Sequence, residues 1–432
     1  MGTTVFARGA LLLVPGFVFI LSSSPVRAEE KTLTLHQVIE FSLQNNGDLK
    51  SFREEKGIRD AVKVRADLLP NPTLDFEAGT GALTGSRDEN RLSIGIMQEF
   101  FLAGKRNKRL TVAERELEVY TWQLTDRKRV VREEVKTAFY DAILANKRTD
   151  LADRAIDLNR QLLDVTRERL AAGDIPELEM NLVKVELARS EGARIDVAKA
   201  LNQSLARLWT LMGLPSGESP AIAGTLDSEV TMTKSLLDLK QLARGNRPDL
   251  KVLEAENSRG EADIILAQAE GVPNLTAGIF YSHERRADAT GTGEVSVRDN
   301  LLGIRFSLPL PLFDRNQAGV QEARAKRSST ESRWLAAGRN VEREVDTAYA
   351  SYLNSEKVLS LYKTNIIPQL EENLKLTQEA YRLGEVGILA VIQEQKKFFE
   401  VSDGYLLALH DRQAALVKLE SAVATDLTGG VQ

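Results

Sequence analysis

The sequence predicts a membrane protein of mixed α and β structure, in which four strands of each chain contribute to a barrel shared between several chains and long helices extend from it. Three observations lead to this expectation. Matching motifs recur in the same order in the two halves of the 432-residue chain. Each half contains a pair of segments in which apolar and polar residues alternate. Each half also ends in two very long stretches with helical periodicity.

The composition excludes several classes of protein. Hydrophobic residues make up 43% of the chain and charged residues 28%, which is too apolar for a disordered protein. Cysteine is absent, so thiolate metal sites, disulfides and an N-terminal lipid on cysteine are excluded. The formal net charge of −5 lacks the basic excess of a nucleic-acid-binding protein. We therefore expect a folded chain that is not a lipoprotein and does not bind nucleic acid.

The first 28 residues have the pattern of a secretory signal peptide. Arg8 precedes an apolar run over residues 10–21, and Val26-Arg27-Ala28 forms a small-residue cleavage site. An uncleaved membrane anchor is the alternative, but a run this short does not span a bilayer as a helix. We expect cleavage after Ala28. No later stretch is apolar enough for a transmembrane helix, so the mature protein is expected to be periplasmic, extracellular or part of a β-barrel.

The recurring motifs divide the rest of the chain into two structural repeats. These cover residues 29–212 and 235–427, with a Pro- and Gly-containing linker at 213–234 and a tail at 428–432. The pairs that match in order include Asn46-Gly47-Asp48-Leu49 with Arg247-Pro248-Asp249-Leu250, Pro70-Asn71 with Pro273-Asn274, and Gly173-Asp174 with Gly384-Glu385. A series of matches in order is the signature of a duplication.

Each repeat is expected to begin with helix, over residues 34–69 and 235–270, with Thr34 as an N-cap. The Pro-Asn pairs stop these helices, because proline cannot continue a helix. A β-hairpin follows in each repeat, at residues 73–100 and 274–308. A long helical hairpin then completes each repeat, at residues 105–212 and 317–426.

The alternating segments suit strands with one apolar and one polar face. In residues 73–78, for example, Leu74 and Phe76 lie opposite Asp75 and Glu77. A transmembrane strand needs about 9–11 residues, with apolar side chains outside and polar ones inside. We expect the barrel lumen to be lined by Asp75, Glu77, Glu99 and Arg305. Residues 79–90 and 283–300 are expected to form long polar loops outside the cell. Two soluble hairpins packed on the helices are the alternative.

The helical hairpins are unusually long. From Lys105 to Leu170 there is neither proline nor glycine, which predicts a helix of roughly 100 Å. Apolar residues along it follow coiled-coil spacing. Residues 171–176 break the first hairpin and residues 384–387 break the second. Pro368 predicts a kink or offset within the helix over residues 317–383.

Closure of the barrel requires more than one chain. Four strands cannot close on themselves, since single-chain bacterial barrels start at about 8 strands. An open sheet in lipid would leave its edge groups without hydrogen bonds. We therefore expect a homo-oligomer whose strands share one barrel and whose long helices form a tube.

Several motifs together resemble the TolC family of outer-membrane efflux proteins, over nearly the whole mature chain. They are Asn45-Asn46-Gly47-Asp48-Leu49, Leu69-Pro70-Asn71-Pro72, the stretch from Gln98 to Arg106, and Tyr381-Arg382-Leu383-Gly384-Glu385. The sequences of the second and third motifs are most similar to the outer-membrane component of cobalt–zinc–cadmium exporters. The resemblance implies a homotrimer in outer-membrane lipid, with a 12-stranded barrel and a periplasmic α-barrel of 12 helices. It also implies a periplasmic membrane-fusion adaptor and an inner-membrane pump of the resistance–nodulation–division type as partners.

The resemblance further implies that the hairpin turns form a periplasmic tip that docks the adaptor. The residues concerned are Leu170, Gly173, Asp174, Tyr381, Arg382, Leu383, Gly384 and Glu385. Members of the family often close this tip with acidic residues just after the second turn, where this chain has Ala390 and Gln393. The candidates for a periplasmic gate are instead Glu177, Glu179 and Glu394.

No catalytic, cofactor or metal site is expected. The histidines His36, His283 and His410 lie far apart, and no pair has metal-ligand spacing. The leading hypothesis is a passive exit duct of a tripartite efflux system, with heavy-metal cations as cargo. A duct for drugs or for type I protein secretion, and a soluble periplasmic coiled-coil scaffold, are the alternatives.

Overall fold

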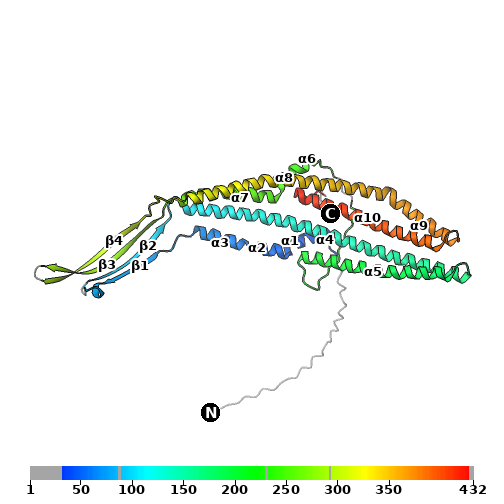
Figure 1. Cartoon of the computed structure of the whole chain (residues 1–432), viewed down its shortest axis with the longest axis horizontal. Helices are drawn as coiled ribbons and strands as arrows, with labels where there is room; N and C mark the ends of the chain where they lie inside the picture. The colour runs from blue at the N-terminus through cyan, green and yellow to red at the C-terminus, as the bar shows by residue number, and fades with distance from the viewer. Residues whose placement is uncertain (1–31, 86–88, 229–231, 291–292, 428–432) are drawn as a thin grey trace, which may run out of the picture.

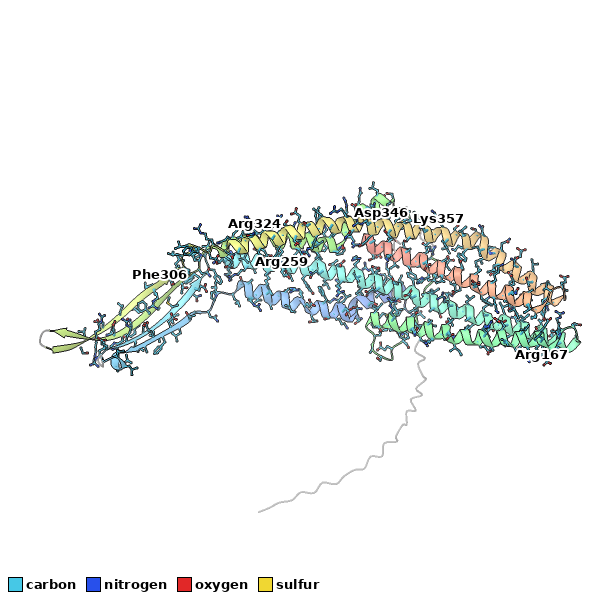
Figure 2. All side chains as sticks on the ribbon, in the orientation of Figure 1. Arg167, Arg259, Phe306, Arg324, Asp346 and Lys357 are labelled. Atoms are coloured by element: carbon cyan, nitrogen blue, oxygen red, sulfur yellow. The ribbon has the colours of Figure 1, made fainter. Side chains whose placement is uncertain are left out.

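The computed structural model describes residues 32–427 except for 86–88, 229–231 and 291–292. The expected signal peptide and tail lie outside these residues. The molecule is elongated, with a sheet at one end and long helices that run from the sheet to the opposite end (Figure 1). Figure 2 places Phe306 on the sheet and Arg167 near the opposite end. None of the described helices combines the length and the apolar content needed to cross a bilayer.

Short helices precede each pair of strands. In the first half they are α1 (Leu35–Asn45), α2 (Gly47–Glu54) and α3 (Lys56–Asp67), and in the second half α6 (Leu236–Asn246) and α7 (Pro248–Glu270). Each half was predicted to begin with a helical stretch, and the structure divides that stretch into separate helices. The backbone of Asn46 and Arg247 leaves the helical region at matching places. The side chain of Asn46 then caps α2, and Pro248 opens α7, where its missing N–H costs nothing.

The predicted start and stop signals of these helices are confirmed. Thr34 caps α1 in a capping box: its hydroxyl accepts from the Gln37 N–H, and the Gln37 side chain accepts from the Thr34 N–H at 3.0 Å. Helix α3 ends before Pro70 and α7 ends before Pro273. The chain therefore leaves each helix at the point where proline removes a donor.

The four strands form one antiparallel sheet in the order β1-β2-β3-β4. The strands are β1 (Thr73–Thr80), β2 (Asn90–Phe100), β3 (Leu275–Thr290) and β4 (Gly293–Ser307). A 3₁₀ turn at Gly81–Leu83 follows β1, within the first predicted loop. Strands β1 and β4 are the two edges, and they run antiparallel to each other.

The prediction of a long loop at residues 283–300 is wrong. Most of this segment continues β3 and β4, which pair from Thr276↔Ser307 as far as Thr290↔Gly293. Polar side chains support the ladder across the two strands: His283 Nδ1 lies 2.8 Å from Asn300 Oδ1, and Arg285 Nε donates to Ser296 Oγ at 2.7 Å. Backbone pairing does not depend on an apolar face, so a polar hairpin can extend beyond the alternating region.

The long helices match the predicted ranges closely. Helix α4 (Lys105–Ala172) has 68 residues, and α5 (Glu177–Met212) returns beside it. In the second half α8 (Gln317–Leu361) and α9 (Ile367–Arg382) are joined by a π-helical turn at Tyr362–Ile366, and α10 (Ile388–Val423) returns. The π turn lies just before Pro368, which confirms the predicted offset, because the proline cannot donate to the preceding turn.

Two apolar clusters hold the middle of the helical region together. One joins α1, α4, α5 and α10 around Phe139 and Leu208, and the other joins α6, α8 and α10 around Val345 and Leu419. The linker at 213–234 is packed against the first cluster through Leu226, which is buried. Two backbone hydrogen bonds also tie it to Leu33, just before α1, for example from Leu33 N to Ala221 O at 2.8 Å.

Candidate functional site

The two long hairpins turn at the same end of the molecule (Figure 1). Both turns use a glycine with positive φ, 83° at Gly173 and 79° at Gly384. In each, the glycine N–H bonds the carbonyl three residues before it, and the next N–H bonds a carbonyl five residues back. This is the Schellman arrangement, which favours glycine because a Cβ is strained at positive φ. The same local chemistry therefore ends α4 and α9.

A buried tyrosine joins the two hairpins close to these turns. The ring of Tyr381, on α9, is 1% exposed and packs in a cluster with Leu162, Val183 and Ile388. Its hydroxyl lies 3.4 Å from the Thr166 hydroxyl and donates to Glu179 Oε2 at 3.3 Å. Burial raises the pKa of this hydroxyl, so it stays protonated and can donate.

An arginine on the first hairpin completes this contact. Arg169 Nη1, on α4, donates to the Tyr381 carbonyl oxygen at 2.7 Å, and the guanidinium lies 4.8 Å from the centre of the Tyr381 ring. We call Thr166, Arg169, Glu179 and Tyr381 the tyrosine clasp. The clasp connects α4 and α5 to α9, so that the two hairpins are held together at their tips.

Most of the predicted docking residues lie on the surface of the tip. Asp174, Arg382 and Glu385 are exposed, Leu383 is 74% exposed, and Leu170 is half-buried. Tyr381 was expected on this surface and is buried instead, because its ring fills the space between the hairpins. Sequence reasoning missed Thr166 and Arg169. The position of Arg169 in the last turn of α4 could have indicated its role, because basic residues there often bond free carbonyl groups.

The three acidic gate candidates have different surroundings. Glu177 is exposed in the first turn of α5. Glu179 is half-buried and accepts a hydrogen bond within the tyrosine clasp. Glu394 is half-buried on α10, 3.8 Å from Lys397 Nζ. Of the three gate candidates, Glu177 is therefore the exposed one.

The sheet has one apolar and one polar face, as its alternating sequence predicts. The register places Asp75 beside Gly95, Gly95 beside Phe280, and Phe280 beside Gly303, so these residues share a face. By the same register, the four residues expected to line a lumen all lie on this polar face: Asp75, Glu77, Glu99 and Arg305.

The opposite face is apolar and exposed in the single chain. Its side chains include Leu74, Phe76, Ile94, Ile96, Ile279, Leu302, Ile304 and Phe306, and Leu302 is 76% exposed. Burying such side chains in an apolar environment contributes about 25 cal/mol per Å². An apolar face of this extent indicates a surface that meets lipid or protein.

Glu99 belongs to a polar junction between the sheet and the helices. Its Oε1 accepts from Asn274 Nδ2 at 2.6 Å, and Asn274 Oδ1 accepts from Lys105 Nζ at 2.6 Å. Lys105 is 2% exposed, and its Nζ also lies 3.6 Å from Glu270 Oε2. This side chain therefore braces the start of α4 against the end of α7, which the sequence did not reveal.

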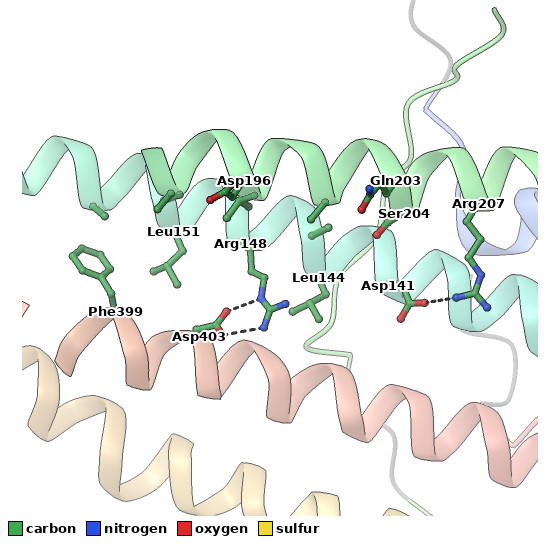
Figure 3. A pocket seen from close by; sticks show the side chains of 16 residues that line it. Asp141, Leu144, Arg148, Leu151, Asp196, Gln203, Ser204, Arg207, Phe399 and Asp403 are labelled. Atoms are coloured by element: carbon green, nitrogen blue, oxygen red, sulfur yellow. Dashed lines mark hydrogen bonds and ion pairs between the residues drawn. The ribbon is translucent and has the colours of Figure 1, made fainter. Parts of the chain in front are cut away.

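A groove with a volume of about 820 Å³ lies between α4, α5 and α10 (Figure 3). Its floor is mostly apolar, and two ion pairs cross its edges: Arg148 with Asp403 at 2.6 Å and Arg207 with Asp141 at 3.4 Å. The carboxylate of Asp141 also lies 2.8 Å from His410 Nε2, and this hydrogen bond raises the pKa of the imidazole. The contacts of Asp403 and His410 tie α10 to α4, and that of Arg207 ties α5 to α4.

Metal ligation has no support in the described part of the chain. Among its residues, no group of three or more His, Asp and Glu side chains is arranged to hold a metal ion. The three histidines also lie in separate elements, on α1, β3 and α10.

The fold is shared with solved outer-membrane channels. A crystal structure of CusC, solved in a study of transmembrane channel formation, superposes with a TM-score of 0.71 at 17% identity and covers 90% of this chain and 91% of CusC. The profile of the family described as outer membrane efflux protein matches residues 38–214 and 239–425. The chain belongs to this family, which confirms the resemblance seen in the sequence.

The curated relatives of this chain include proteins that are named for metal resistance. The cobalt-zinc-cadmium resistance protein CzcC of Cupriavidus metallidurans is 23% identical over 90% of this chain and 89% of its own length. The nickel-cobalt-cadmium resistance protein NccC of Alcaligenes xylosoxydans is 22% identical over 63% of this chain and 59% of its own length. The expectation of similarity to the metal exporters is thus confirmed at the level of relatives.

Proposed function

We propose that three copies of this chain form a passive exit duct across the bacterial outer membrane. Each copy would contribute four strands to a barrel of about 12 and its long helices to a tunnel in the periplasm. The observation that carries the proposal is the sheet. It exposes a broad apolar face, carries charge on the other face, and ends at two edge strands, β1 and β4, that run antiparallel.

Barrel closure follows from these edges. In lipid, every backbone N–H and C=O needs a partner, so an open sheet of four strands is not viable. Strand β4 of one copy can pair with β1 of the next in the antiparallel sense that the rest of the sheet uses. The apolar face would then meet lipid, and the polar face would line the lumen. The shared order of elements in the two halves fits an internal duplication, as the paired motifs predict.

The tips of the hairpins are the proposed docking surface for a periplasmic adaptor, which connects the duct to an inner-membrane pump. Exposed Leu383 and Leu178 supply apolar contact area, and Asp174, Arg382 and Glu385 supply charges around it. The tyrosine clasp would hold the hairpins together in the closed tip. Opening the duct would then require the clasp to break, with Glu177 facing the passage.

Heavy-metal cations are the proposed cargo, because CzcC and NccC are named for metal resistance. The pump would supply the energy and most of the selectivity. Drugs or secreted proteins remain the alternative cargo. A soluble coiled-coil scaffold, the other alternative, would not need an apolar sheet face.

Channel formation is tested by adding the purified protein to planar lipid bilayers. The proposal predicts discrete conductance steps, whereas a scaffold would give none. Cargo is tested by deleting the gene and measuring growth on zinc, cobalt, cadmium, copper and silver, alongside several drugs. Loss of metal tolerance that the restored gene reverses would support the metal assignment. Unchanged metal tolerance with the partner pump expressed would contradict it.

A further inference from the structure

An aromatic ring lies on the polar face of the sheet, where the alternating pattern would place a polar side chain. Phe280 shares this face with Asp75 and Glu77 by register. Its two cross-strand neighbours are both glycines, Gly95 on β2 and Gly303 on β4. An apolar ring between two glycines on a polar face calls for a local explanation.

The glycines let the ring lie flat against the sheet. A Cβ built at Gly303 would lie 2.6 Å from Phe280 Cζ, and one built at Gly95 would lie 3.0 Å from Phe280 Cβ. The ring therefore occupies the space that a side chain at residue 303 would need. As a result, Phe280 is half-buried on the wall and does not project away from it.

Arg305 lies against this ring. Its guanidinium carbon is 4.8 Å from the ring centre, and its direct cross-strand neighbour is Gly278, which has no side chain to obstruct it. Cations favour the face of an aromatic ring because of the ring's quadrupole. Phe280 thus fixes the position of the guanidinium group on the polar face.

Within one chain, Arg305 makes no ion pair with another described residue. The other arginines that the register places on this face have an acidic partner: Arg91 lies 3.1 Å and Arg286 lies 3.4 Å from a carboxylate oxygen of Glu284. Within one chain, Asp75 and Glu77 are on β1, three strand spacings or roughly 14 Å away. In the proposed barrel, β1 of the next copy would lie beside β4, so Arg305 would act on passing ions together with the carboxylates of that strand.

We propose that Arg305, positioned by Phe280, is a selectivity-determining cation of the barrel lumen that opposes the passage of positive ions. This inference rests on the proposed channel function. Rings of fixed charge on a pore wall set ion selectivity, because low-dielectric walls focus their field. The charge of Arg305 would make the barrel less cation-selective than its carboxylates alone would make it.

The test is the reversal potential of the purified full-length protein in planar bilayers under a KCl gradient. Arg305→Gln should raise the potassium-to-chloride permeability ratio by about twofold to fourfold, because a unit charge roughly 10 Å away in water changes the local concentration of each ion by about twofold, in opposite directions. Arg305→Lys keeps the charge and should stay near the wild-type ratio. Arg298→Gln is the matched control, because Arg298 lies on the opposite face of β4.

The outcomes separate this inference from the channel proposal. A raised ratio in Arg305→Gln alone supports the inference. Normal conductance with an unchanged ratio in Arg305→Gln overturns it, and so does an equal shift in Arg298→Gln, which would indicate a general surface-charge effect. Absence of conductance from the wild-type protein would overturn the channel function itself.

Discussion

Replacing Arg169 with alanine should loosen the tip of the molecule while leaving its middle intact. The substitution removes the hydrogen bond to the Tyr381 carbonyl and the contact with the Tyr381 ring. A hydrogen bond to a charged group contributes about 1.5–3 kcal/mol. The cation–π contact contributes about 0.5–2 kcal/mol. Because one guanidinium makes both contacts, the two values do not add fully, and we expect a loss of about 2–3 kcal/mol.

A loss of this size raises the population of the opened tip roughly 30- to 150-fold. Amide hydrogen exchange measures it directly, because the exchange of residues 376–392 reports the local opening of the α9–α10 turn. Exchange there should accelerate by that factor, while residues in the cluster around Leu419 should be unaffected. The mean open time of single channels should also lengthen.

Arg167→Ala is the matched control. Arg167 lies two residues away on α4 and pairs with Asp164 at 3.0 Å, with both side chains more than half exposed. Exposed pairs of this kind contribute about 0–1 kcal/mol. If Arg169→Ala and Arg167→Ala gave the same exchange rates, the tyrosine clasp would not hold the hairpins together.

Three further perturbations test other parts of the account. The pKa of His410 is raised in the folded protein, so the bond of the imidazolium to Asp141 stabilises the fold fully below a pH of about 6.5. This stabilisation is lost as the pH rises through the folded pKa. The melting temperature should therefore fall between pH 6 and 8, and His410→Gln should reduce that fall. Gly303→Ala places a methyl group against the Phe280 ring, which should reduce the free energy of unfolding by about 1–3 kcal/mol and lower the melting temperature. An unchanged melting temperature would mean that the ring is not fixed against residue 303. Lys105→Ala leaves buried oxygen acceptors without a donor, so thermal unfolding should show a loss of about 1–3 kcal/mol, and no loss would contradict the bracing role.

Periodicity was enough to predict the elements whose pattern is long and regular. The stretch from Lys105 onward lacks proline and glycine, and it forms a single helix to Ala172. The turns at Gly173 and Gly384 were predictable because only glycine adopts positive φ without strain. The two-faced strands were predictable from strict alternation, so the polar face was correctly assembled from residues far apart in the chain.

Long-range packing decided what the sequence could not predict. The hairpin over residues 283–300 has loop-like composition, but its backbone pairs along almost its whole length. Tyr381 looked like a surface residue of a turn, and its burial depends on the second hairpin meeting the first. Glu99 fits the lumen pattern, yet Asn274 and Lys105 connect it to the helices. For Tyr381 and Glu99 the deciding partner lies far away in the chain, where local patterns carry no information.

The most direct test of the central claim is the location and mass of the native complex. Inner and outer membranes would be separated by density, and the detergent-extracted complex would be weighed by light scattering or native mass spectrometry. The account predicts outer-membrane protein with about three chains per particle, as closure of a barrel from four-stranded sheets requires more than one copy. A soluble periplasmic monomer or dimer would contradict it.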